Sequence, residues 1–199
     1  MRFHGRLSSM NRALLATIAA TLSIGSALGQ AGVESELRKL GDFFQIYMVR
    51  EDRRGPEDAV DVRRNRDGTY VAEISYWRSL SSRDPGEEIC QAYGWLLFGR
   101  GSYGKGAKDA FEKYPTLSQI NLRLYDMEFG TRVGRRRAEI LPTQKMIPYL
   151  RIGVGRANLA KKMSEGSVKR AIEKGKCAGV GKDYFNLVWL DEGYIRQAK

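Results

Sequence analysis

The spacing of apolar residues changes along the chain, and each change predicts a new element. Between residues 33 and 49 apolar side chains recur every three or four positions, which predicts an amphipathic helix. Further apolar residues at Phe43, Ile46 and Tyr47 widen this face, so we expect the helix to pack on a sheet. The residues at helical spacing are Val33, Leu37, Leu40, Phe44 and Met48.

The next segment has apolar residues at every second position. Val60 and Val62 come first, and an alternating run from Tyr70 to Tyr76 follows them. Asp67-Gly68 lies between the two runs, and Asp-Gly is a preferred turn of two-stranded hairpins. We therefore predict a β-hairpin with its turn at Asp67-Gly68.

Helical spacing returns after a serine-rich loop. Glu87 and Glu88 open a helix whose apolar residues run from Ile89 to Leu97. A glycine-rich turn over residues 99–106 then leads into a second, short helix over residues 107–114.

Alternation resumes after residue 121 and predicts the centre of the sheet. In the last of these strands we expect Leu150 and Ile152 on the buried face, and Tyr149 and Arg151 on the other. Pro148 indicates an edge or a bulge at that point. The predicted strands cover residues 122–129, 135–141 and 145–154.

Two helices complete the predicted fold. The first covers residues 157–176 and is weakened by Gly166, and the second covers residues 183–196. The order of elements predicts an α+β fold, with a mostly antiparallel sheet of about five strands flanked by helices. Residues 32–199 are the right length for a single domain with its own core.

Residues 1–31 have a different pattern, typical of a signal peptide. Arg2, Arg6 and Arg12 precede an apolar run over residues 13–24, and Ala27-Leu28-Gly29 fits a processing site. We expect a protein that is exported, to a periplasm or outside the cell. An uncleaved anchor is the alternative, although the apolar run is shorter than the roughly 20 residues that cross a bilayer. No stable membrane span is expected after cleavage.

Histidine and cysteine usage narrows the chemistry. The only histidine, His4, lies in the predicted signal peptide, so a mature chain has no imidazole for a catalytic triad, a zinc site or a proton shuttle. We expect no metal and no cofactor. Cys90 and Cys177 are the only cysteines, and two cysteines in an oxidising compartment usually pair. Such a bridge closes a loop of about 90 residues and adds about 4 kcal/mol of stability in the chain-entropy model.

The chain is strongly basic, with a formal net charge of +11. Removal of the three arginines of residues 1–31, which contain no acidic residue, lowers this charge to +8. A positive field favours an anionic envelope component, such as phospholipid head groups or acidic polymers, or an acidic protein. Solubility alone is the other explanation of the charge. An exported chain is not expected to bind nucleic acid.

Two basic segments and one tryptophan are the candidate binding surface. Arginine forks suit phosphate and carboxylate groups, and Trp77 is predicted on the strand face opposite Tyr76, where it could contact a partner. A solvated charged surface is the alternative. The candidate residues are Trp77, Arg132, Arg135, Arg136, Arg137, Lys161 and Lys162.

The sequence Gly99-Arg100-Gly101-Ser102-Tyr103-Gly104 fits the G-x-G-x-x-G spacing of a dinucleotide site. Such a motif needs a strand before it, whereas the preceding segment is predicted as a helix. We therefore expect a glycine loop here without a cofactor.

Asp126 and Glu128 are predicted on one face of a strand. A protonated and an ionised carboxyl group can together hydrolyse a glycosidic bond without histidine. Acidic residues at this spacing are more often exposed to solvent or paired across strands, here with Arg135 or Arg137. We therefore expect a non-catalytic binding or accessory protein of the cell envelope, with a glycan hydrolase that uses Asp126 and Glu128 as the alternative.

Overall fold

The computed structural model describes residues 29–45, 59–77, 84–99, 104–128, 131–134, 137–140, 145–160 and 165–197. The chain divides into two units, Met1–Glu36 and Leu37–Lys199. The predicted signal peptide lies outside the described residues except for its last three, which are helical. The second unit contains the sheet and both candidate sites.

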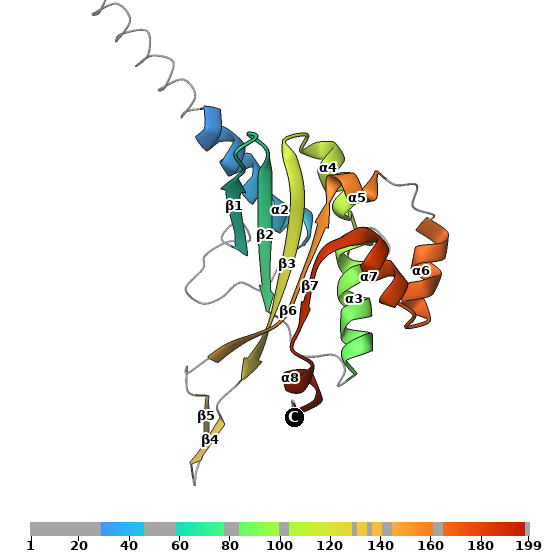
Figure 1. The fold of residues 1–199 in the computed structure, drawn as a ribbon. Coiled ribbons are helices and arrows are strands. Elements are labelled where there is room, and N and C mark those ends of the chain that lie inside the picture. The colour runs from blue at the N-terminus through green and yellow to red at the C-terminus, as the bar shows by residue number, and fades with distance from the viewer. Residues whose placement is uncertain are drawn as a thin grey trace, which may run out of the picture. The chain divides into compact units, whose positions relative to one another are not determined.

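Five strands form a mixed, mostly antiparallel sheet in the order β1-β2-β3-β6-β7 (Figure 1). The β2–β3 pair is parallel and the other three pairs are antiparallel. This sheet and its helices confirm the predicted α+β class. The strands are β1 (Val60–Arg64), β2 (Tyr70–Trp77), β3 (Leu117–Glu128), β6 (Lys145–Gly155) and β7 (Phe185–Leu190).

The predicted hairpin is confirmed as the β1–β2 pair, with its turn where the sequence placed it. Gly68 has a φ of 85°, a conformation that favours glycine. The Asp67 carboxylate accepts hydrogen bonds from the Thr69 hydroxyl at 2.7 Å and from the Thr69 backbone N–H at 2.9 Å. These two bonds lower the pKa of Asp67, and they hold the turn closed.

Two helices cross from β2 to β3, because parallel neighbours cannot be joined by a tight turn. The first is α3 (Pro85–Phe98) and the second is α4 (Ala107–Lys113). Both were predicted, although α3 begins two residues before Glu87. Asp84 caps its start and accepts a hydrogen bond from the Gly86 N–H at 2.8 Å.

The predicted N-terminal helix is confirmed over its described part. Residues 29–38 are helical, α2 (Leu40–Phe43) follows, and residues 46–49 of the prediction lie outside the described residues. Leu37, Leu40 and Phe44 are buried, as their helical spacing predicted.

The C-terminal part differs from the prediction. The expected helix over residues 183–196 is wrong, because its first half is strand β7, which pairs with the edge of β6. Phe185 and Trp189 are four residues apart, a spacing that fits a helix, but the backbone groups of β6 need a partner strand. The described helices here are α5 (Arg156–Leu159), α6 (Glu165–Glu173), α7 (Ala178–Tyr184) and α8 (Glu192–Gln197).

A bulge changes the predicted face of one residue. The β3–β6 register shifts between Leu124 and Tyr125, so that Leu124 pairs with Leu150 and Tyr125 with Pro148. Tyr149 is the extra residue, and it is fully buried, whereas the alternating pattern predicted it on the unburied side of the strand with Arg151. The bulge that Pro148 indicated is therefore present, and it explains why the prediction for Tyr149 is wrong.

Helix α3 forms the middle of the core on the helical side of the sheet. Its Trp95 ring packs on Tyr76 of β2 with ring centroids 4.8 Å apart, and its Tyr93 ring stacks on Phe185 of β7 at 4.1 Å. Burial raises the pKa of Tyr93 to about 12. The predicted disulfide between Cys90 of α3 and Cys177 is confirmed, with a Cα–Cα distance of 5.4 Å.

Within the described ranges, no helix has both the length and the apolar character needed to cross a membrane. The disulfide is consistent with folding in an oxidising compartment.

Candidate functional site

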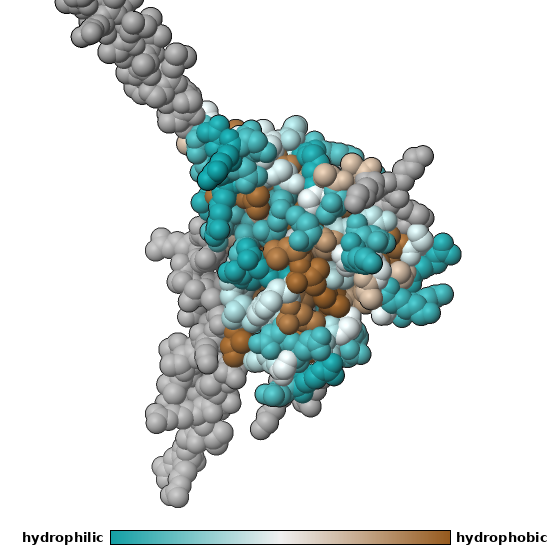
Figure 2. Space-filling model, viewed as in Figure 1, coloured by the Kyte–Doolittle hydropathy of each residue, from teal (hydrophilic) through white to brown (hydrophobic). Residues whose placement is uncertain are grey.

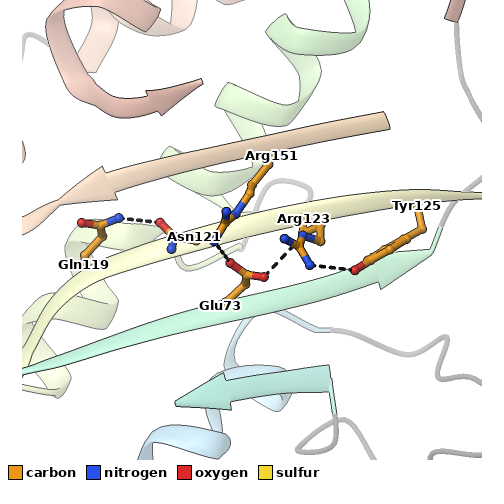
Figure 3. A network of polar contacts seen from close by, with 6 residues as sticks. All are labelled: Glu73, Gln119, Asn121, Arg123, Tyr125 and Arg151. Carbon is orange, nitrogen blue, oxygen red and sulfur yellow. Dashed lines mark hydrogen bonds and ion pairs between the residues drawn. The ribbon is translucent and has the colours of Figure 1, made fainter. Parts of the chain in front are cut away.

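The sheet has two chemically different faces. Ala72, Ile74, Leu122, Leu124 and Ile152 are buried on the side of the helices. Alternate residues of the same strands point to the other side, where polar side chains gather (Figure 3). We call this side the polar face, and its residues include Asp61, Glu73, Ser75, Gln119, Asn121, Arg123, Tyr125, Arg151, Leu187 and Trp189.

An ion triad lies at the centre of the polar face. The Glu73 carboxylate of β2 contacts Arg123 of β3, with an N–O distance of 3.4 Å, and also contacts Arg151 of β6. The Glu73 side chain is only 8% exposed, whereas those of Arg123 and Arg151 are 35% and 31% exposed. Two arginines thus share one buried carboxylate, and the triad keeps a formal charge of +1.

Hydrogen bonds fix the triad in place. The Arg123 guanidinium donates to the Tyr125 hydroxyl at 3.3 Å. This bond raises the pKa of Arg123, and the carboxylates of Glu73 and Asp61 raise it further against the effect of desolvation. Arg123 therefore stays protonated and keeps a fixed orientation.

A chain of amides runs from Asn121 of β3 towards β7. Asn186 donates to Gln119 at 2.9 Å, and Gln119 donates to Asn121 at 2.7 Å. Gly153 of β6 leaves the space for this chain, because a Cβ atom there would collide with the Asn121 side chain. The polar face thus offers ordered amide and guanidinium groups over three adjacent strands.

The sheet register adds an aromatic residue to this arrangement. Arg123 is paired with Arg151, and Arg151 with Trp189 of β7, so the three form one row across the sheet. Trp189 and Val188 are each 45% exposed and are the exposed large apolar residues of the described chain. Figure 2 shows an apolar patch over β7, surrounded by hydrophilic residues. A basic and aromatic row therefore reaches the edge of the sheet.

The predicted arginine cluster lies on a separate two-stranded ribbon. Arg132 belongs to β4 (Thr131–Gly134) and Arg137 to β5 (Arg137–Ile140), and the register pairs Arg132 with Glu139. The side chains of Arg132 and Arg137 are outside the described part, as are Arg135 and Arg136 altogether. Their role in binding stays a prediction.

Three other predicted binding residues also stay predictions. Trp77 ends β2, but its side chain lies outside the described residues, and so do Lys161 and Lys162. None of them is placed beside the triad by the described structure.

The structure describes the side chain of only one of the two acidic residues, Asp126 and Glu128, on which the glycan hydrolase hypothesis depends. Asp126 accepts a hydrogen bond from the Tyr194 hydroxyl of α8 at 2.9 Å. Glu128 lies two residues further along β3, and its side chain lies outside the described part. The cross-strand positions opposite the two acids are Ile147 and Lys145, so the expected pairing with Arg135 or Arg137 is wrong. The strand opposite β3 is β6, not the arginine-rich ribbon.

The glycine-rich segment does not have the context of a dinucleotide site. Gly99 follows helix α3 and has a φ of 77°, where a β-strand would be required. A side chain at Gly106 would collide with the backbone of Leu97, so this glycine allows the chain to pass close to the end of α3. Residues 100–103 lie outside the described part, so the expectation of a glycine loop over them stays a prediction.

Four residues of the polar face were not identified from the sequence as site residues. Glu73, Arg123 and Arg151 fall on the polar positions of predicted strands, and this alternation was the available signal. Trp189 was not identified because residues 183–196 were predicted as a helix, which gives no sheet face to position 189. Among the described residues, no three His, Cys, Asp or Glu side chains gather where they could hold a metal ion.

Comparison of the chain with protein-family models, with curated proteins and with solved structures finds no match.

Proposed function

We propose that this chain is an exported, non-catalytic binding or accessory protein of the cell envelope that engages an anionic envelope component or an acidic protein. The observation that carries the proposal is the row of Arg123, Arg151 and Trp189 on the polar face. The predicted signal peptide and the disulfide support export.

The arrangement of the two arginines suits binding of an anion. The Glu73 carboxylate contacts both guanidinium groups and holds them in one orientation. The two arginine side chains therefore lose little conformational freedom when a partner binds. About a third of each arginine side chain remains exposed, and guanidinium forks bind carboxylate and phosphate groups with two hydrogen bonds. Trp189 adds an exposed ring at the end of the row, which can pack on a sugar or on an apolar side chain.

The predicted basic segments extend the same proposal. Arg132 and Arg137 occupy both strands of the β4–β5 ribbon, and Arg135 and Arg136 connect these strands in the sequence. We propose that these arginines, with Trp77, Lys161 and Lys162, add long-range attraction for an anionic partner.

The test is a titration of the purified mature protein with polygalacturonate, an acidic polysaccharide, and with vesicles that contain phosphatidylglycerol. The informative variant is E73Q/R123Q/R151Q, which removes all three charges of the triad together. Its net charge falls by one. The matched control is R170Q, which also lowers the net charge by one but changes an exposed residue of α6.

The proposal predicts that the triple variant binds at least one of these probes about tenfold more weakly than the wild type, whereas R170Q stays within about twofold. An equal effect of both variants would mean that only net charge matters and would overturn the proposal for the polar face. Absence of binding of either probe by the wild type would count against an anionic envelope component.

The second candidate function is that of a glycan hydrolase. The observation that supports it is the hydrogen bond that the Tyr194 hydroxyl donates to Asp126. This bond holds the Asp126 carboxyl group in a fixed orientation. Asp126 and Glu128 would then act together as the pair of carboxyl groups that glycoside hydrolysis requires. Loss of glycan turnover in Glu128→Gln, with an unchanged fold, supports this function, and absence of turnover by the wild type removes its basis.

A further inference from the structure

A second basic site lies on the helical side of the sheet, away from the polar face. A cavity of about 400 Å³ opens where α2 meets the start and the end of α4. This volume lies in the range of small-molecule sites, about 300–1,000 Å³. Its lining residues are Lys39, Asp42, Phe43, Gln45, Lys105 and Lys113.

Three lysines from separate parts of the chain converge on this cavity. Lys39 precedes α2, Lys105 lies just before α4, and Lys113 is the last residue of α4. Among the described lining residues Asp42 is the one carboxylate, so these residues have a formal charge of +2. A single carboxylate ligand would neutralise half of this charge, whereas a phosphate monoester, which carries close to two negative charges above pH 7, would neutralise it completely.

Aromatic rings hold one of the lysines in position. The Lys113 ammonium nitrogen lies 5.7 Å from the ring centroid of Phe43 and 5.1 Å from that of Tyr114. The Phe43 and Tyr114 rings pack edge to face at 6.4 Å. These contacts keep the ammonium group against the wall of the cavity. Phe43 also lines the cavity itself and gives it an apolar side.

The backbone at the end of α2 is unusual in the same place. Gln45 has a φ of 54°, a left-handed conformation in which glycine or asparagine is more common. Its N–H donates to the Asp42 carbonyl at 2.9 Å, and this turn places Gln45 in the cavity lining. Residues other than glycine in this backbone conformation are found more often at active sites and ligand-binding sites than elsewhere.

We infer that this cavity binds a phosphate monoester whose attached group is small and apolar or aromatic. Lys39, Lys105 and Lys113 contact the phosphate oxygens as point charges, and Phe43 packs against the attached group. The site does not depend on the proposed function of the polar face. The phosphate can belong to a free small molecule or to a lipid head group, and the experiment separates these sources.

The first experiment titrates the mature protein at pH 8 with phenyl phosphate and with benzoate, which has the same ring but a single charge. Binding is followed by calorimetry and by the backbone amide signals. We expect phenyl phosphate to bind about tenfold more tightly than benzoate and to shift the amides of Lys105 and Lys113. Vesicles of phosphatidic acid in phosphatidylcholine form the second arm, since their phosphate is anchored to lipid.

Matched variants decide whether the cavity is responsible. K105Q/K113Q removes two lining charges and is expected to lower the affinity for the phosphate probe about tenfold. K174Q/K182Q removes two exposed lysines elsewhere, so it lowers the net charge by the same amount, and it is expected to bind the phosphate probe within about twofold of the wild type.

Each outcome supports or overturns the inference. Phenyl phosphate binding that depends on Lys105 and Lys113 supports a free ligand, and vesicle binding alone with the same dependence supports a lipid head group. Failure of both probes to bind, equal binding of benzoate, or equal losses in K105Q/K113Q and K174Q/K182Q overturns it. Because E73Q/R123Q/R151Q tests the other face, a failure here is distinguishable from a failure of the proposed function.

Discussion

The two faces of strand β3 are held in place by different physical forces. Leu122 and Leu124 are buried under the helices and depend on apolar contacts with many neighbours. Asn121 and Arg123, on the opposite face, depend on a few hydrogen bonds and on the Glu73 carboxylate. Loss of one apolar contact leaves others in place, whereas loss of Glu73 leaves two arginines without their shared partner. The helical side therefore provides stability, and the polar face provides the ordered charges that we propose for binding.

The disulfide is expected to make the largest single contribution on the helical side. It joins α3 to the start of α7 across 87 residues, so the double variant C90A/C177A should lose about 4–5 kcal/mol of unfolding free energy. Urea unfolding at neutral pH measures this loss. A loss below about 1 kcal/mol would show that the bridge adds little to the packing of α3.

Adjacent residues of β3 give the sharpest contrast between the faces. Leu124→Ala should lower the unfolding free energy by about 3 kcal/mol, because it leaves a cavity in a fully buried position. Arg123→Met should cost less than about 1 kcal/mol, because Arg151 still pairs with Glu73 and the methionine keeps the apolar stem. Similar losses in both variants would contradict the division of roles between the two faces.

The triad provides a test within the polar face. Glu73→Gln should destabilise the fold by about 1–2 kcal/mol, because Arg123 and Arg151 then lie close together without a shared carboxylate. The triple variant E73Q/R123Q/R151Q should be more stable than the single variant, since the repulsion is removed as well. A triple variant that unfolds more easily than Glu73→Gln would contradict this explanation.

Tyr93 is expected to produce the smallest effect at neutral pH, and one that appears only as the pH rises. Its pKa is about 12 in the folded protein and near 10 in an unfolded chain. Its contribution to stability is fully present below about pH 10 and is lost as the pH rises towards about 12. The Tyr93→Phe variant has no phenol to ionise at this position. Its thermal unfolding temperature should therefore fall less than that of the wild type between about pH 9.5 and pH 11.5. An identical loss in both proteins would contradict burial of the phenol.

Local patterns in the sequence were sufficient to predict most of the helical side. The alternation from Tyr70 to Tyr76 and the helical spacing after Glu87 each depend on neighbouring residues, and both predictions are confirmed. The disulfide was predictable because Cys90 and Cys177 had no other partner. The prediction of a hairpin turn at Asp67-Gly68 depended on glycine at a single position, and the φ of Gly68 confirms it.

The polar face could not be predicted, because it depends on which strands are neighbours. Glu73 and Arg123 are 50 residues apart and meet only because β2 and β3 pair in parallel across two helices. Trp189 was missed because its spacing from Phe185 fits a helix, and only the unpaired edge of β6 selects a strand. Local sequence gives the face of each residue, but not its partner on the next strand.

Two tryptophans allow the central claim to be tested directly. Trp95 is buried in α3 on the helical side, and Trp189 is exposed on β7. Each indole N–H gives a separate nuclear magnetic resonance signal, which can be followed while polygalacturonate is added to the mature protein. The account predicts that the Trp189 signal shifts in step with binding while the Trp95 signal stays in place. Binding that leaves Trp189 unchanged would contradict the claim that the polar face is the binding surface.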